Sequence, residues 1–359
     1  MKFVHIADMH LDSPFTLLNK NGIGKKRRSE QINALKKVIE YIKENNIKYL
    51  FICGDLYEHE YIRQSTIEYV NNLFKQIEKT KIYIVPGNHD PKIKNSYYEK
   101  YNWNSNVYIF SRKIEKIEEQ NIDIYGYGFD DFYIEMPRYE ELKIENKEKI
   151  NILLTHADLD GAGNKEIIYN PISKTKLQEL GYNYVALGHI HKLMQMREKN
   201  TCIAYPGSTI SLGFDELGNH GMIVGDINLE TKEIKTEFVS IDEAEFKEIE
   251  LNVDEIYTKE ELIEKINGLK LQENKYYKII LQGKRTFEID TNEIVKQIEN
   301  LQIIKIKDKT KIKIDLEELA KQNNLKGIFV RELLEKIKQN PEEKEKLEKA
   351  IEIGLDAFN

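Results

Sequence analysis

The stretch KFVHIADMH, at residues 2–10, is an apolar run that ends on two metal-capable residues, Asp8 and His10. Four more runs of this kind follow along the chain. They are YLFICGD ending at Asp55, IYIVPGNHD with Asn88 and His89, INILLTH ending at His156, and YVALGHIH with His189 and His191. Each run is short and rich in aliphatic and aromatic residues, which is typical of a strand buried on both faces. The sequence therefore predicts metal-capable side chains at the ends of five buried strands.

These strand ends can form one site although they are far apart in the sequence, because open α/β sheets bind ligands beyond the carboxyl ends of their strands. Asp8 and His10 are two residues apart, so on extended backbone they would point to the same side and could hold one ion together. His189 and His191 repeat this spacing. The carboxylate of Asp55 has two oxygens and could bridge two cations. Mixed imidazole and carboxylate ligands suit Mn, Fe or Zn better than Mg or Ca.

The order of the predicted elements indicates an α/β fold. Amphipathic helices are predicted at 29–46 and 64–79, between the first three strands. This βαβαβ order favours a mostly parallel sheet. Beyond residue 107 the strands lie too close together for helical crossovers, with one short helix at 173–180, so we expect a second sheet. Residues 1–240 are thus predicted to form a four-layer sandwich of two packed β-sheets flanked by helices.

The pattern of the sequence changes near residue 241. Strand-like and helix-like segments alternate through residues 241–312, which predicts a small α+β domain. Residues 313–359 predict helices, interrupted at Pro341. We therefore expect three parts, of which residues 1–240 carry all the candidate ligands.

The composition is that of a globular protein. The chain has 359 residues, of which 40% are hydrophobic and 32% charged. No apolar stretch approaches the roughly 20 residues that span a bilayer, and the N-terminus lacks the basic and apolar regions of a signal peptide. We therefore expect a cytoplasmic protein with no membrane association, and Cys53 and Cys202 buried and reduced. The net charge of −7 neither indicates nor excludes a nucleic-acid ligand.

The series of motifs resembles a known family. D-x-H, G-D, G-N-H-D, H and G-H-x-H, in this order, are similar to the signature of calcineurin-like metallophosphoesterases. The segments HIADMHLDSP, CGDLY, VPGNHD, LGHIH and AYPGS resemble the SbcD group of DNA repair exonucleases, and most of all its YhaO-like branch. The resemblance is strong over residues 1–240. It is weaker through residues 241–312, which stand where that family has its DNA-capping domain.

The resemblance implies two divalent metal ions, usually manganese in this family. The ligands it implies are Asp8, His10, Asp55 and His191 for the first ion, and Asp55, Asn88, His156 and His189 for the second. His89 is not a ligand in the family but helps to position and protonate the reacting phosphodiester, so it is the predicted catalytic residue; the alternative is a structural imidazole. Glu58 could orient His89, or it could be a solvated loop residue.

The function predicted from this resemblance is that of a two-metal DNA exonuclease in DNA repair, with endonuclease activity on single strands or hairpins. A small-molecule phosphodiesterase or phosphatase is one alternative, and a non-catalytic DNA-end scaffold is another. The resemblance also implies a homodimer and an SMC-type ATPase partner similar to SbcC. The ATPase would be a separate subunit, because this chain has no Walker A motif. Phe329, Leu333 and Leu334 would dock on it, or would pack on their own chain.

Weaker signals remain open. The basic run Lys25–Arg28 is predicted in a loop, where it would contact a DNA backbone or be solvated. The four aromatic residues within 97–103 would stack an unpaired base or pack in the core. His220 is expected in a turn, and Ser208 is expected near the site without a catalytic role.

Overall fold

The chain divides into two compact units. The structure, a computed structural model, describes residues 1–15, 22–161, 169–313 and 315–358. The first unit comprises Met1–Lys247 and Leu271–Tyr277, and the second Glu248–Lys270 and Lys278–Asn359. The three-part division expected from the sequence remains a prediction.

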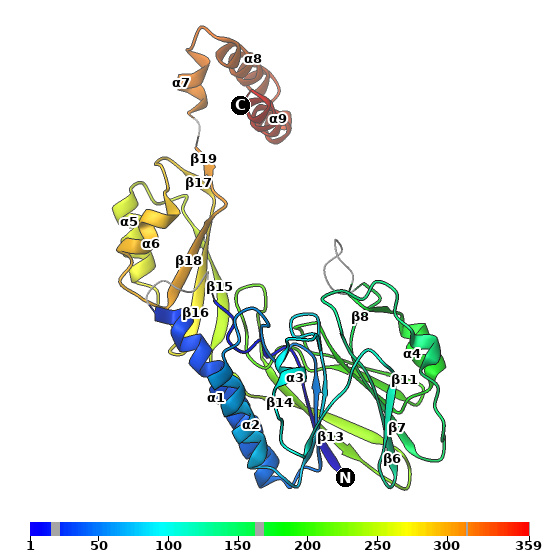
Figure 1. The fold of residues 1–359 in the computed structure, drawn as a ribbon. Coiled ribbons are helices and arrows are strands. Elements are labelled where there is room, and N and C mark those ends of the chain that lie inside the picture. The colour runs from blue at the N-terminus through cyan, green and yellow to red at the C-terminus, as the bar shows by residue number, and fades with distance from the viewer. Residues whose placement is uncertain (16–21, 162–168, 314, 359) are drawn as a thin grey trace. The chain divides into compact units, whose positions relative to one another are not determined.

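Two six-stranded sheets form the first unit (Figure 1), in the orders β14-β13-β1-β2-β3-β4 and β11-β12-β10-β7-β6-β5. Strands β1 to β4 are parallel to one another, and so are β6, β7, β10 and β12. The first sheet comprises β1 Lys2–Ile6, β2 Tyr49–Cys53, β3 Lys81–Val85, β4 Val107–Ile109, β13 Gly221–Ile227 and β14 Ile234–Ser240. The second comprises β5 Glu115–Glu118, β6 Ile122–Tyr127, β7 Ile150–His156, β10 Tyr184–Gly188, β11 Met194–Glu198 and β12 Thr201–Tyr205. The predicted second sheet is confirmed.

Helices cover the outer face of each sheet. The helices are α1 Ile23–Glu44 and α2 Gln64–Lys75 on the first sheet, α4 Lys174–Leu180 on the second, and the short α3 Tyr97–Lys100 and η3 Tyr139–Glu141. A minor sheet pairs β8 Asp158–Leu159 with β9 Pro171–Ile172. Three buried clusters fill the spaces between the helices and the first sheet, between the two sheets, and between the second sheet and α4. The predicted four-layer sandwich is therefore confirmed.

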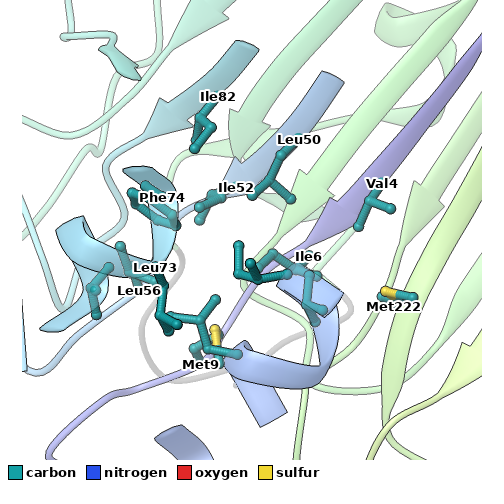
Figure 2. Packing of buried hydrophobic residues seen from close by; sticks show 14 of the residues in the cluster. Val4, Ile6, Met9, Leu50, Ile52, Leu56, Leu73, Phe74, Ile82 and Met222 are labelled. Atoms are coloured by element: carbon teal, nitrogen blue, oxygen red, sulfur yellow. The ribbon is translucent and has the colours of Figure 1, made fainter. Parts of the chain in front are cut away.

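Alternation along the strands builds these layers. In β2, Leu50 and Ile52 lie in the cluster under the helices, where they meet Phe74 of α2 (Figure 2). Tyr49 and Phe51 point to the opposite face and fill the space between the sheets. Because β2 is buried on both faces, its sequence is a continuous apolar run rather than an alternating one. Each such side chain contributes about 1.5–3 kcal/mol by leaving water.

Helix α1 begins earlier than predicted, and the basic run Lys25–Arg28 lies in its first turns. The expectation of a loop there is wrong. The Arg27 side chain is fully buried and donates to the carbonyl of Ser211 at 2.6 Å. It also forms ion pairs with Asp242 at 2.9 Å and Glu30 at 2.7 Å. Arg27 therefore forms internal ion pairs, and it neither contacts solvent nor is available to a DNA backbone.

The residues from 245 onward form the predicted α+β elements and helical tail. The strands β15 Glu245–Asn252, β16 Lys275–Gln282 and β18 Ile303–Asp308 form one sheet, β17 Lys284–Arg285 pairs with β19 Lys311–Ile312, and the helices are α5 Lys259–Asn267 and α6 Thr291–Gln297. The tail comprises α7 Leu316–Ala320, α8 Leu325–Gln339, η4 Pro341–Glu343 and α9 Lys344–Ala357. None of the helices in the described part of the chain is both long and apolar enough to span a bilayer. Cys53 and Cys202 are buried free thiols, as expected.

Candidate metal centre

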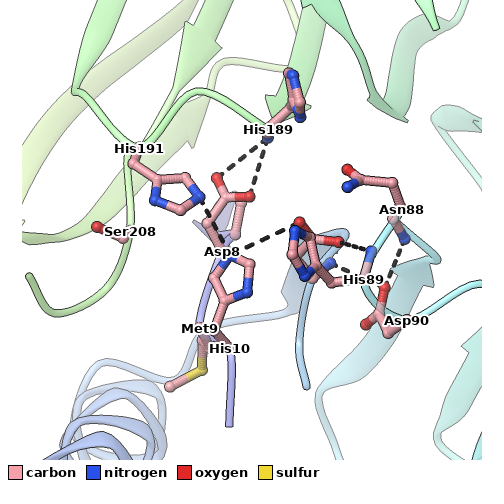
Figure 3. Close-up of polar contacts among 12 residues, drawn as sticks. Asp8, Met9, His10, Asn88, His89, Asp90, His189, His191 and Ser208 are labelled. Atoms are coloured by element: carbon pink, nitrogen blue, oxygen red, sulfur yellow. Dashed lines mark hydrogen bonds and ion pairs between the residues drawn. The ribbon is translucent and has the colours of Figure 1, made fainter. Parts of the chain in front are cut away.

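The carboxyl ends of five strands carry the predicted ligands. Asp8 follows β1, Asp55 follows β2, Asn88 follows β3, His156 ends β7, and His189 follows β10. Each sheet presents its candidates at one edge, because β1 to β3 are parallel and β7 is parallel to β10. Figure 3 shows His10, His189 and His191 around Asp8, with His89 on the side of Asn88 and Asp90. The predicted convergence of the strand ends therefore occurs.

Left-handed backbone, rather than extended backbone, carries three of these residues. The φ angles are 51° at Asp8, 47° at His10 and 53° at Asp55. The expectation that Asp8 and His10 lie on extended backbone is wrong, since β1 has already ended. Main-chain bonds from Asp8 N to Gly54 O (3.1 Å) and from His10 N to Asp55 O (2.9 Å) hold the two loops together. Residues other than glycine rarely adopt this conformation, and such strain is concentrated at functional sites.

Glycines allow the two sheets to touch at the site. A Cβ atom on Gly54 would overlap the ring of His156, and one on Gly188 would overlap the carbonyl of Cys53. At this contact Nδ1 of His156 donates to the Cys53 carbonyl at 2.9 Å. Because a carbonyl only accepts, Nδ1 carries the proton and Nε2 keeps a lone pair for a metal.

Asp90 fastens the loops that carry Asp55 and Asn88. Its buried carboxylate accepts four hydrogen bonds, from the main-chain N–H groups of Gly87 (2.6 Å), Asp55 (3.0 Å) and Leu56 (2.7 Å) and from the Tyr98 hydroxyl (2.6 Å). Burial and the charge of Asp55 raise the pKa of Asp90 to about 7. Asp90 is the last residue of the GNHD motif, but its role depends on tertiary contacts that the motif does not indicate.

Asp8, His10 and His191 form one group of possible ligands, with ligand atoms within 4.8 Å of one another. The Nε2 atoms of His10 and His191 are 3.1 Å apart. Two nitrogen ligands that lie about 2.1 Å from one ion, at nearly a right angle, are separated by about 3 Å. The spacing of these two rings therefore fits a shared ion.

Asp8, Asp55 and His156 form a second group, and all three are buried. The Nε2 atom of His156 is 3.3 Å from Oδ2 of Asp55 and 3.0 Å from Oδ1 of Asn88. The same Oδ2 of Asp55 lies 3.7 Å from Nε2 of His10. Asp8 belongs to both groups, and the Oδ2 atom of Asp55 lies between His156 of the second group and His10 of the first, as a bridging carboxylate would.

His189 is placed differently from the other candidates. Its main-chain N–H donates to both carboxylate oxygens of Asp8, at 3.0 and 3.2 Å (Figure 3). Its ring lies outside the two groups, 5.3 Å from the ring centres of both His156 and Tyr169. With φ of 103°, His189 also departs from the extended backbone expected for the G-H-x-H pair. Its role as a ligand of the second ion remains a prediction.

The donor set fits two divalent cations. Asp8 and Asp55 are buried carboxylates about which several imidazoles gather, and Asn88 adds a neutral amide oxygen. Buried carboxylates are costly unless positive charge compensates them. Oxygen and imidazole donors together favour manganese, iron or zinc over calcium.

His89 lies beside these groups and is held by Glu58. The Glu58 carboxylate contacts two imidazoles, with Oε1 2.7 Å from Nδ1 of His10 and Oε2 3.0 Å from Nδ1 of His89. Burial lowers the pKa of His89, but the hydrogen bond with Glu58 and the charge of Asp55 outweigh burial and raise it to about 9. Glu58 thus makes the contact that an orienting role requires.

The aromatic residues within 97–103 pack in the core. Tyr98 is buried on Asp90, and the Trp103 indole donates to the main chain of Tyr97 at 3.0 Å. All four rings belong to the cluster under the helices or pack against it. Of the two interpretations left open, the structure supports core packing.

A different set of aromatic residues borders the centre. Phe132, Tyr133 and Tyr169 line a hollow of about 270 Å³ together with Asn88 and His89. Phe132 and Tyr133 are exposed, and the rings of Tyr133 and Tyr169 are stacked 5.5 Å apart. These residues lie in loops between strands, where no sequence motif marks them.

Comparison with known proteins places this centre in a family. The calcineurin-like phosphoesterase family matches residues 1–193, more than half of the chain. The chain belongs to this family. The matched segment of this phosphoesterase contains the whole D-x-H, G-D, G-N-H-D, H and G-H-x-H series.

Two curated relatives support the resemblance to the SbcD and YhaO group. This phosphoesterase is 24% identical over 247 residues to the uncharacterized metallophosphoesterase YhaO of Bacillus subtilis, covering 64% of this chain and 59% of the relative. It is 26% identical over 255 residues to the SbcD subunit of the SbcCD nuclease of Staphylococcus epidermidis, covering 60% of this chain and 63% of the relative. The chain thus spans about three-fifths of the length of these relatives. Among solved structures, a dimetal phosphatase from Danio rerio aligns with a TM-score of 0.41 at 10% identity, over 67% of this chain and 99% of that one.

We expect Asp90→Ala to disable the centre without touching any candidate ligand. The change leaves buried main-chain donors unpaired, so the free energy of unfolding should fall by more than about 3 kcal/mol and bound manganese should drop well below the wild-type content. Tyr98→Phe removes only one of the four hydrogen bonds and should cost about 1 kcal/mol with full metal content. Denaturant titration and elemental analysis would measure both variants; equal behaviour of the two would contradict this role of Asp90.

Proposed function

We propose that this phosphoesterase is a metal-dependent DNA nuclease that hydrolyses phosphodiester bonds with two divalent ions, manganese in the cell. The main support for the chemistry is the position of the Asp55 carboxylate between His10 and His156, with His89 beside it. The similarity to a nuclease subunit at 26% identity supports DNA as the substrate. The homodimer expected from the resemblance remains a prediction.

The proposed ligands keep the assignment made from the sequence. They are Asp8, His10, Asp55 and His191 for one ion, and Asp55, Asn88, His156 and His189 for the other. Cations held there supply Lewis-acid polarisation of the phosphodiester and a lowered pKa for water. The chain's own residues orient these ligands. Gln31 donates to the carbonyls of Met9 and His10 at 3.1 and 2.8 Å and fixes the first loop from beneath.

His89 is the proposed proton donor to the leaving oxygen. Glu58 accepts at Nδ1 of His89, which leaves Nε2 free to face a substrate. The side chain of His89 is 45% exposed, so a phosphodiester can reach it. A sugar alkoxide is a poor leaving group, and a placed proton donor accelerates its departure by about 10²–10⁴-fold.

The hollow beside His89 supports a nucleotide substrate. Its exposed rings, Phe132 and Tyr133, lie next to the position proposed for the phosphate, at Asn88 and His89. Bases of single strands stack on such rings without sequence preference, at about 1–3 kcal/mol each. A phosphatase for small aliphatic substrates would gain nothing from them.

We expect the purified protein to degrade linear end-labelled DNA in the presence of Mn²⁺ and to stop when a chelator is added. Cyclic nucleotides, tested in parallel, should remain intact. Cleavage of cyclic nucleotides with intact DNA would establish the small-molecule alternative. Binding of DNA ends without cleavage of either substrate would establish the scaffold alternative.

His89→Ala should lower kcat on DNA by about 10²–10⁴-fold while the manganese content stays at the wild-type level. A thymidine phosphodiester with a p-nitrophenolate leaving group needs no proton, so its hydrolysis should fall much less. Elemental analysis and the two rate assays separate the possibilities. Loss of metal would show that His89 is a ligand, and equal loss on both substrates would exclude the role of proton donor.

We further propose that the helical tail binds an SbcC-like ATPase. Phe329, Leu333 and Leu334 pack against the tail's own buried residues, so they contribute little free surface. Leu325 and Ile328 on α8 are instead 68% and 48% exposed. Apolar residues in this i, i+3 arrangement suit a partner helix.

Replacing both Leu325 and Ile328 with glutamate should abolish co-purification with a co-expressed SbcC-like subunit, because charge would enter an apolar interface. Nuclease activity of the isolated protein should not change. Leu301→Glu is the matched control, since Leu301 is 61% exposed outside the tail. Unchanged co-purification of the double variant would place the partner surface elsewhere.

A further inference from the structure

Glu216 is a partly buried carboxylate that has no role in the proposed reaction. It lies in the segment between β12 and β13, and its side chain is only 14% exposed. One oxygen, Oε1, is 2.5 Å from Nδ1 of His191. The other, Oε2, accepts from the hydroxyl of Ser208 at 2.8 Å and from the main-chain N–H of Leu212 at 3.0 Å. Oε2 of Glu216 is thus fixed by two hydrogen bonds, and Oε1 is in contact with His191.

The surrounding segment is built to keep Glu216 in place. His220, which is expected in a turn, is buried just before β13; its Nδ1 lies 2.9 Å from the Ser208 hydroxyl, and its Nε2 donates to the Glu216 carbonyl at 2.9 Å. The Ser211 hydroxyl donates to the same carbonyl at 2.9 Å. Both the main chain and the side chain of Glu216 are therefore anchored before any ligand binds.

The contact repeats the one that Glu58 makes with His10. In each case a carboxylate contacts Nδ1, and the two Nε2 atoms face each other 3.1 Å apart. A carboxylate at this position fixes the imidazole tautomer and makes the metal-facing nitrogen more basic. Loss of such partners typically costs 10–100-fold in metal affinity.

The histidines proposed for the second ion have weaker partners. Nδ1 of His156 donates to the neutral carbonyl of Cys53, and the ring of His189 contacts the ring of Tyr169. His10 and His191 therefore each have a carboxylate hydrogen-bonded at Nδ1, whereas Nδ1 of His156 donates to a neutral carbonyl and its nearest carboxylate oxygen, Oδ1 of Asp8, is 3.9 Å away. The two proposed ion sites share Asp55, so this difference in histidine partners is a main distinction between them.

We propose that Glu216 is a positioning residue for His191 and that, together with Glu58, it makes the site of Asp8, His10 and His191 the tighter of two unequal metal sites. This inference rests on the proposed function only for its metal binding, and it is independent of the substrate. The ligand class is a divalent transition-metal ion.

A manganese titration tests the inference without any activity measurement. The full-length protein is stripped with chelator, and free Mn²⁺ is counted by its electron paramagnetic resonance signal as metal is added. Wild type should show two unequal classes of site. Glu216→Gln should weaken the tighter class by about 10–100-fold and leave the weaker class unchanged. Asp215→Asn removes the same charge from an exposed neighbour and should change neither class.

Two further variants separate positioning from damage to the segment. Ser208→Ala removes a support of Glu216 but keeps the contact with His191, so its effect should be much smaller than that of Glu216→Gln. In a His191→Asn background, Glu216→Gln should cause little further loss, because its effect passes through the imidazole. Thermal melting checks that each variant is folded.

Three results would overturn the proposal: equal affinities in wild type, equal weakening of both classes by Glu216→Gln, or an undiminished effect of Glu216→Gln in the His191→Asn background. If Glu216→Gln weakens only the tighter of two unequal manganese sites but the wild-type protein leaves DNA intact, the inference is supported and the proposed nuclease activity is excluded. If the protein cleaves DNA but Glu216→Gln does not selectively weaken one manganese site, the nuclease proposal stands and this inference is excluded.

Discussion

The centre depends on one close approach between the carboxyl ends of two sheets. Gly54 and Gly188 have no side chains, so the main chain after β2 can touch β7 and β10, and His156 can donate across the gap to Cys53. Without this contact the ligands would lie at the edges of two separate sheets. Every other feature of the centre, from the position of Asp55 to the orientation of His156, requires the sheets to be this close.

The convergence of the strand ends could be predicted from the sequence, because buried strands have a strong apolar signature and parallel strands end at a common edge. The local geometry could not. Asp8 and His10 were expected on extended backbone, but tertiary hydrogen bonds to Gly54 and Asp55 hold them in the left-handed region. No local pattern reports such bonds, since their partners lie some 45 residues away along the chain.

The residues that support the ligands were also hidden from sequence reasoning. Glu58 and Asp90 each have a local signal, since Glu58 lies three residues after Asp55 and Asp90 ends the GNHD motif. Glu216 has no comparable signal: it stands in a loop outside every motif of the site, and only the folded chain brings it to His191. The expectation that Lys25–Arg28 form an exposed loop is wrong for a related reason. Arg27 is buried by an ion pair with Asp242, which is remote in sequence.

Arg27 connects this basic run to the centre in a way that limits how the surface can be redesigned. It binds the carbonyl of Ser211, whose hydroxyl in turn holds the main chain of Glu216. An engineer who wished to reduce non-specific attraction of polyanions could neutralise Lys25 or Lys26, which are exposed. Arg27 has the same formal charge and adjoins them in the sequence, but it functions as part of the interior. Near the N-terminus of α1, the charges of Lys25 and Lys26 can therefore be replaced, whereas the charge of Arg27 is needed for the internal ion pairs.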